Sequence, residues 1–245
     1  MKRTIVFLLL IAHFTGPAQN IKIAAAPNLR YVLDELKASF EKQNPQIHLL
    51  VTFGSSGTLY QQITNGADFD VFMSADRTFP EKLKADGVVN GDVNIYAYGK
   101  LVLWSNTIDL KSQSIDVLLK KKVVHIAIAK PEVAPYGERA IECLKYYHLL
   151  DKVKDKIVYA DNISQTAQFA QSGNAQIGFL ALSLALAPEM KGSYLLLDTK
   201  SYKPVDQGIV LLKATKNKDA AEKFIKFILS KGCKLIFEKN GYTFP

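Results

Sequence analysis

The sequence predicts an α/β protein of two lobes, each a mainly parallel sheet flanked by helices. Apolar segments of strand length alternate with amphipathic helices along most of the 245 residues, a pattern typical of parallel sheets. A long strand signal near residue 97 and helices that follow a late strand near residue 206 fit a chain that crosses between lobes twice. We therefore expect one lobe to hold residues 19–97 and 206–245, and the other to hold residues 98–205.

The composition excludes several classes of protein. Hydrophobic residues make up 48% of the chain and charged residues 22%, as in an ordinary globular protein and unlike a disordered one. Two cysteines exclude a disulfide-rich scaffold and a cysteine-based zinc cluster. A net charge of +8 slightly favours anionic ligands. Because no basic stretch is interleaved with aromatic residues, we expect no nucleic-acid partner.

The first 18 residues have the pattern of a secretory signal peptide. Lys2 and Arg3 precede an apolar run over residues 4–14, and the small residues of Gly16-Pro17-Ala18 follow it. The apolar run is shorter than the ~20 residues that a membrane span needs. We therefore expect cleavage after Ala18 and export of a soluble mature protein.

The first half of the chain alternates strand and helix signals. Runs rich in β-branched and aromatic residues predict strands, and apolar residues at helical spacing predict helices. Pro45 ends the first helix, and Asp86-Gly87 ends the third. The predicted strands cover residues 21–26, 47–53, 70–74 and 95–104, and the predicted helices cover residues 28–43, 58–64 and 78–85.

The second half continues the same alternation. Pro135 opens a helix at a position where proline is favoured, and Ser172-Gly173 closes another. The predicted strands cover residues 123–129, 157–160, 176–180, 194–197 and 208–212, and the predicted helices cover residues 135–150, 163–171 and 220–229.

Four turns place small or polar residues at a helix start directly after a strand. They cover residues 26–28, 54–57, 134–137 and 161–164. Such turns lie at the carboxyl ends of strands, where ligands bind, and helix starts offer unpaired N–H groups and a partial positive charge. Asn28, Ser56 and Asn162 also suit plain helix caps, and Tyr136 also suits a core. The four turns together predict an anion site.

Six segments in and around these turns carry a family resemblance. They cover residues 23–29, 53–59, 70–76, 131–137, 176–179 and 236–242. The most specific are the serine turn Phe53-Gly54-Ser55-Ser56-Gly57 and the strand Asp70-Val71-Phe72-Met73-Ser74-Ala75-Asp76. Together the segments resemble the periplasmic molybdate-binding proteins of ABC transporters, which have the type II solute-binding fold. The resemblance covers nearly the whole mature chain.

The resemblance implies a function and a binding site. It implies a monomeric periplasmic protein that captures molybdate or tungstate for an ABC transporter permease, with no catalysis, no cofactor and no bare metal cation. The oxyanion would lie between the lobes, held by hydroxyl and N–H donors without lysine or arginine. The first lobe would supply Asn28 and Ser56, with Ser55 beside it. The second lobe would supply the N–H groups of Tyr136 and Ile163.

Three residues modify this expected site. Many members of the family add a tyrosine hydroxyl where this chain has Ala181, so that contact is missing here. Pro27 has no N–H to give, and Asn28 must therefore supply the donor of the first turn. A carboxylate in the site would select a protonated ligand, but we expect Asp161 to cap a helix with its side chain turned away.

Other interpretations remain open at this point. The ligand could be tungstate, sulfate or phosphate, since the sequence does not give the size of the site. An exported hydrolase would need a nucleophile beside a base, but residues 54–57 are one residue short of a nucleophile elbow and no histidine lies beside a serine turn. A sensory or adhesive module is the third alternative. We expect Cys143 and Cys233 to lie in different lobes as free, buried thiols.

Overall fold

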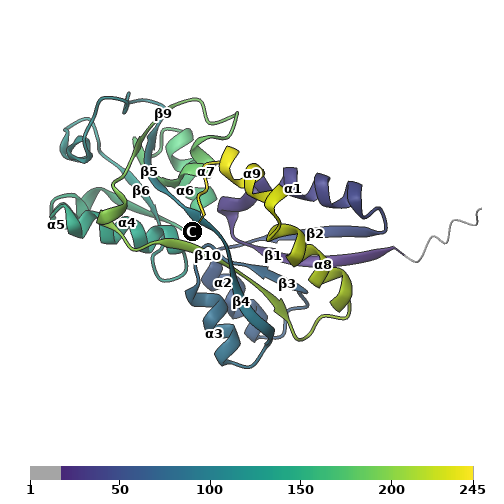
Figure 1. The fold of residues 1–245 in the computed structure, drawn as a ribbon. Helices are drawn as coiled ribbons and strands as arrows, with labels where there is room; N and C mark the ends of the chain where they lie inside the picture. Colours follow the sequence, from purple (N-terminus) through teal and green to yellow (C-terminus); the bar gives the residue numbers. More distant parts are fainter. Residues whose placement is uncertain (1–17, 245) are drawn as a thin grey trace, which may run out of the picture.

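The computed structural model describes residues 18–244 (Figure 1). Two five-stranded sheets, each flanked by helices, form two lobes, as the sequence predicts. The order of strands is β2-β1-β3-β10-β4 in the first lobe and β7-β6-β8-β5-β9 in the second lobe. The expected signal peptide lies, Ala18 apart, outside the described residues. Within residues 18–244, no helix combines the length and apolar character needed to cross a membrane.

The elements have the following bounds. The strands are β1 Gln19–Ala25, β2 Ile47–Phe53, β3 Val71–Met73, β4 Val89–Gly99, β5 Leu101–Ser105, β6 Ile126–Ala129, β7 Ile157–Ala160, β8 Ile177–Ala181, β9 Ser193–Leu196 and β10 Val205–Leu212. The helices are α1 Arg30–Gln43, α2 Ser56–Thr64, α3 Thr78–Ala85, α4 Pro135–Tyr146, α5 Leu150–Val153, α6 Ile163–Gln171, α7 Leu182–Ala185, α8 Lys218–Ile228 and α9 Lys231–Lys239. A 3₁₀ turn, η1 Pro27–Leu29, leads into α1.

One strand in each sheet runs against the other four. β10 is antiparallel to both of its neighbours, β3 and β4, and β5 is antiparallel to β8 and β9. The remaining neighbours are parallel. Both reversed strands directly follow a crossing between the lobes. Because the other strands of a sheet point the same way, their carboxyl ends meet at one edge, where α/β proteins bind ligands.

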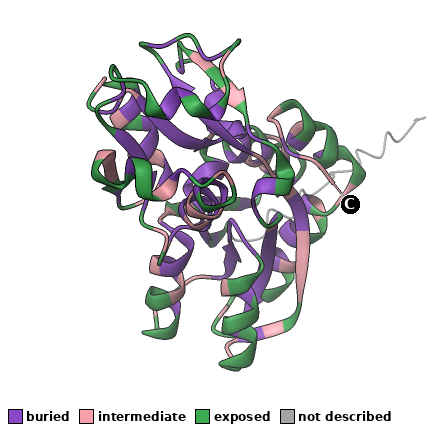
Figure 2. Cartoon of the chain, turned by 90° about the vertical axis from the view of Figure 1, so that its left-hand side faces the viewer, coloured by how far each residue is buried: buried purple, intermediate pink, exposed green. Residues whose placement is uncertain are grey.

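Helices cover both faces of the first sheet, and the strand pleat decides which residues they contact. Ile23 of β1 belongs to the core cluster beneath α1 and α8, whereas its neighbour Ala24 belongs to the cluster beneath α2 and α3. On the first face, the rings of Phe40 and Phe224 meet edge to face at 5.2 Å. In the second lobe, Trp104 of β5 is fully buried. Figure 2 shows the buried residues concentrated in the strands and the exposed ones on the outer helices.

The structure corrects three of the predicted elements. The strand predicted over residues 95–104 is two strands, β4 and β5, which break at Lys100 and belong to different sheets. The helix predicted over residues 135–150 ends at Tyr146, and His148 takes the left-handed φ of 54° that interrupts a helix. The strand predicted from Val123 begins only at Ile126. The short helices α7 and α9 were not among the predicted elements.

Both cysteines are free and buried, as predicted. Cys143 lies on α4 of the second lobe and Cys233 on α9, which packs against α1 of the first lobe. Burial raises the pKa of Cys143 to about 11, and a hydrogen bond from the Ser201 hydroxyl lowers it only in part. Burial raises the pKa of Cys233 as well. Both thiols are therefore protonated near neutral pH.

We expect neither thiol to react with an aromatic disulfide reagent in the folded protein at pH 8. The thiolate is the nucleophile, and a thiol with a pKa near 11 is almost wholly protonated three pH units below it. The coloured product should appear only after unfolding in guanidinium chloride, in an amount matching the two cysteines. Rapid release of one equivalent from the native protein would contradict this assignment of buried thiols.

Candidate functional site

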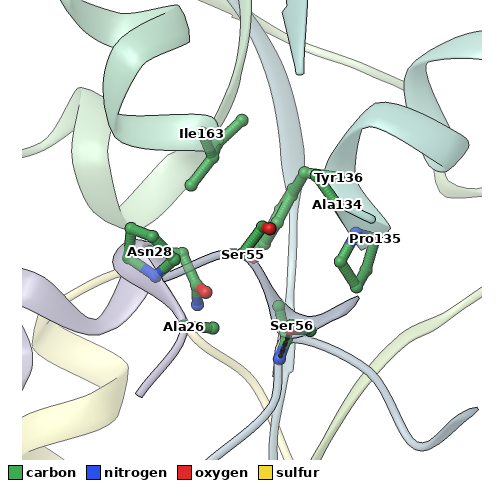
Figure 3. A pocket seen from close by; sticks show the side chains of 10 residues that line it. Ala26, Asn28, Ser55, Ser56, Ala134, Pro135, Tyr136 and Ile163 are labelled. Carbon is green, nitrogen blue, oxygen red and sulfur yellow. Dashed lines mark hydrogen bonds between the residues drawn. The ribbon is translucent and has the colours of Figure 1, made fainter. Parts of the chain in front are cut away.

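A small pocket lies between the two lobes, at the edge where strands end and helices begin (Figure 3). The lining residues are Ala26, Pro27, Asn28, Ser55, Ser56, Ala75, Ala134, Pro135, Tyr136 and Ile163. The cavity volume open to the centre of a water-sized sphere is about 10 Å³. A cavity of roughly 10–15 Å³ by this measure holds a single water molecule. The pocket is therefore small, of a size that suits a small ion.

All five residues predicted for the site line this one pocket. They are Asn28, Ser55, Ser56, Tyr136 and Ile163. Figure 3 shows Asn28 on one side of the pocket and Pro135 and Tyr136 on the other. Four segments that are far apart in the sequence therefore meet at a single point.

Asp161 and Ala181 are not among the ten lining residues. The Asp161 carboxylate is 68% exposed and pairs with Lys130 Nζ at 2.6 Å, turned away as predicted. Asn162 caps α6, because its Oδ1 accepts the N–H of Gln165 at 3.0 Å. In the fourth turn, Asn162 caps the helix and the next residue, Ile163, lines the pocket.

The lining residues at helix starts present N–H groups without partners in their own helices. Ser56 and Ile163 are the first residues of α2 and α6, and Tyr136 is the second residue of α4. N–H groups in a first helical turn have no intrahelical acceptor, and the helix dipole makes them partially positive. Asn28 and Tyr136 each follow a proline, so each carries the first N–H available in its turn. The backbone alone therefore creates a site for an anion.

The two serines of the second turn have different partners. Ser56 Oγ accepts the N–H of Ala75 at 3.0 Å, which fixes the oxygen and leaves its proton free to be donated. Ser55 Oγ lies 2.6 Å from Thr58 Oγ1, and either hydroxyl can be the donor of this bond. Because α2 begins at Ser56, this serine is not the helix cap, and the capping interpretation is wrong for it. Ser56 therefore brings a free hydroxyl proton to the pocket lining.

A buried amide network surrounds Asn28 and was not predicted. Asn28 Nδ2 donates to Gln207 Oε1 at 2.9 Å and to the Tyr242 hydroxyl at 3.0 Å. The Tyr242 hydroxyl lies 2.9 Å from the carbonyl oxygen of Asn28. Gln207 is fully buried on β10, and Tyr242 follows α9. Tyr242 lies in a segment that carries the family resemblance, whereas no sequence signal singles out Gln207.

Hydrogen bonds between the lobes show that they are closed on each other. The N–H of Gly57 donates to the carbonyl of Val133 at 2.9 Å. Ser183 Oγ, in α7 of the second lobe, donates to the carbonyl of Asn28 at 2.9 Å. A Cβ at Gly57 would lie 2.8 Å from Val133 Cα, so the lobes can approach this closely only at a glycine.

The pocket contains no charged side chain among its ten lining residues. Asp76, which follows the lining residue Ala75, is buried, and burial raises the pKa of its carboxyl. The Ser74 hydroxyl, the N–H of Phe79 and the charge of Arg139 lower this pKa in part. No cluster of three or more histidine, cysteine or carboxylate side chains for a metal ion occurs within the described residues. A pocket of neutral donors suits an anion that carries no proton.

The chain matches a protein family and curated proteins over most of its length. Residues 21–243 match the sequence model of a family described as bacterial extracellular solute-binding protein. The molybdate-binding protein ModA of Rhodobacter capsulatus is 37% identical over 227 residues, covering 92% of this chain and 89% of that protein. The ModA of Azotobacter vinelandii is 35% identical over 228 residues, covering 92% of this chain and 90% of that protein.

Solved structures share the fold. The periplasmic molybdate-binding protein of Azotobacter vinelandii superposes with a TM-score of 0.86 at 35% identity, covering 92% of this chain and 99% of that one. The sulfate-binding protein SubI of Mycobacterium tuberculosis superposes with a TM-score of 0.76 at 11% identity, covering 91% of this chain and 86% of that one. The second likeness concerns the fold alone.

Proposed function

The chain belongs to the family of bacterial extracellular solute-binding proteins, and on this premise we propose that it captures molybdate between its lobes for an ABC transporter. The observation that carries the proposal is the pocket itself. Neutral donors from both lobes converge on a charge-free space sized for a small ion. The lining holds no histidine, cysteine or carboxylate that could act as a general base, which favours binding over catalysis.

In the proposed complex, each lobe contributes donors to the oxyanion. Asn28 and Ser56 act from the first lobe, and the N–H groups of Tyr136 and Ile163 act from the second. Ser55 lies beside Ser56 in the lining and is hydrogen-bonded to Thr58. A hydrogen bond to a charged group contributes about 1.5–3 kcal/mol net, and helix starts add about 0.3–1 kcal/mol each. Neutral donors can therefore hold a dianion without a cation.

We also propose how the protein is exported, how its lobes move and which second ligand it binds. The chain is exported, cleaved after Ala18 and acts as a monomer that delivers its ligand to a membrane permease. The lobes comprise residues 19–97 with 206–245, and residues 98–205. They open and close about the two crossings, and the contact with a tyrosine hydroxyl is missing at Ala181. Tungstate, with nearly the same size and charge as molybdate, is proposed as a second ligand.

Calorimetry with four oxyanions tests the function. Molybdate and tungstate should bind with dissociation constants at or below about 1 μM, which corresponds to about 8 kcal/mol. Sulfate, being smaller, should leave donors unfilled and bind much more weakly. Monohydrogen phosphate, being protonated, should bind weakly because the lining has no carboxylate to accept its proton. If only sulfate or phosphate gives heat of binding and a thermal shift, that ion and not molybdate is the ligand. If none of the four oxyanions gives heat of binding, the proposal is refuted.

Removing the Ser56 hydroxyl tests the site. We expect Ser56→Ala to weaken molybdate binding roughly ten- to hundredfold, because one donor to a charged ligand is lost. The matched control is Ser55→Ala, whose hydroxyl is engaged by Thr58 and should matter less. Calorimetry gives the affinities, and thermal unfolding of the unliganded variants checks their folding. If Ser56→Ala binds within twofold of the parent, its hydroxyl does not contact the ligand.

Closure of the lobes is measurable in solution. The ligand is held by both lobes, so binding should stabilise the closed form seen here, with its bonds from Gly57 to Val133 and from Ser183 to Asn28. Small-angle X-ray scattering should therefore show a smaller radius of gyration with molybdate than without it. An unchanged radius together with tight binding would mean that the free protein is already closed.

A further inference from the structure

The Asn28 side chain, as it stands, presents the wrong end of its amide to an anion. Both protons of Asn28 Nδ2 are used, one by Gln207 and one by Tyr242. The other end, Oδ1, is buried and has no hydrogen-bond partner among the described residues. Since Asn28 lines the pocket and its Nδ2 end is held elsewhere, Oδ1 is the end left for the ligand. An oxyanion would meet an acceptor there and be repelled.

The hydrogen-bonded network around Asn28 also contains a conflict, because it has fewer protons than its close oxygen pairs require. The Tyr96 hydroxyl lies 3.0 Å from the carbonyl oxygen of Ser74 and 2.8 Å from Gln207 Oε1, two acceptors for its single proton. The Tyr136 hydroxyl accepts from Gln207 Nε2 at 3.2 Å, so the proton of the Tyr136 hydroxyl has no acceptor on Gln207. One oxygen pair in this buried cluster therefore lacks a proton between its atoms.

Turning the Gln207 amide by 180° removes this conflict. Its Nε2 then donates to the Tyr96 oxygen, and Tyr96 donates its proton to Ser74. Its Oε1 accepts the proton of Tyr136. The second proton of Nε2 now points at Asn28 and requires an acceptor there, so the Asn28 amide must turn as well.

With both amides turned, the conflict at Tyr96 is gone, and the oxygen pair without a proton moves to Tyr242, whose single proton faces both Asn28 Oδ1 and the carbonyl oxygen of Asn28. Asn28 Oδ1 accepts from Gln207, and Ser183 continues to donate to the carbonyl of Asn28. Asn28 Nδ2 is then directed into the pocket as a donor. The two amides are coupled, because turning one alone sets two donors or two acceptors against each other.

We propose that Gln207 is a positioning residue for the ligand: it orients the Asn28 amide so that Nδ2 faces the oxyanion, and the two amides turn together when the anion binds. This inference rests on the proposed function. Gln207 does not line the pocket and acts only through Asn28. The site is crowded, since a Cβ on Gly99 would overlap the Tyr136 hydroxyl and lie 2.7 Å from Gln207 Nε2.

A double-mutant cycle tests whether Gln207 acts through Asn28. Gln207→Met keeps the volume of the side chain and removes both ends of the amide, and we expect it to weaken molybdate binding about tenfold or more. Asn28→Ala removes the donor itself. The double variant should bind no more than twofold more weakly than Asn28→Ala alone, because Gln207 has nothing left to orient. If the loss of molybdate affinity in the double variant equals the product of the losses in the two single variants, the proposal is overturned.

A nuclear Overhauser measurement on the unmutated protein tests the turned amides even if Gln207→Met does not fold. With molybdate bound, the side-chain NH₂ of Gln207 should give a cross-peak to the ring of Tyr96. A cross-peak to the Tyr136 ring alone would mean that the amides have not turned, and would overturn the proposal. Failure of the unmutated protein to bind molybdate refutes the proposed function. Binding by the parent together with Gln207→Met affinity within twofold refutes only the role of Gln207.

Discussion

An anion enclosed without a positive side chain must receive a donor for each of its oxygens, because burial removes the water that would otherwise solvate it. This requirement accounts for much of the architecture around the pocket. No single turn of this chain carries enough donors, so starts of helices from both lobes must point at one place. The parallel strands of each sheet bring these starts to the same edge, and the crossings at Lys100 and Val205 let the two edges face each other.

The contacts that close the lobes and the contacts that shape the pocket are largely the same. The carbonyl of Asn28 receives Ser183 from the other lobe, while its side chain is held by Gln207 and Tyr242. Gln207 in turn bonds to the hydroxyl of Tyr136, a residue that lines the pocket from the second lobe. The state of the pocket is thereby linked to the state of the hinge through direct hydrogen bonds.

Local patterns predicted the turns that line the pocket, the family resemblance named the residues within them, and the long-range contacts were not predictable from the sequence. The turns that carry Ser56 and Ile163 are visible in sequence because a strand signal, a cap and a helix signal follow one another within a few residues. The crossing at Lys100 is hidden, since apolar strand residues continue on both sides of it and only the sheet partner changes. The role of Gln207 depends on its contacts with Asn28, which is 179 positions away in the sequence, and with Tyr136, which is 71 positions away. No periodicity in the sequence reveals such contacts.

The glycine that the lobe interface requires has a practical consequence. At Gly57, which is not itself a lining residue, a single methyl group would press against the backbone of Val133 in the opposite lobe and against the ring of Phe79 in its own lobe. The position therefore separates the chemistry of recognition from the mechanics of closing. Gly57→Ala would produce a binding protein that keeps the lining residues of both lobes but whose lobes cannot close fully. Such a variant could show which conformation a transporter accepts.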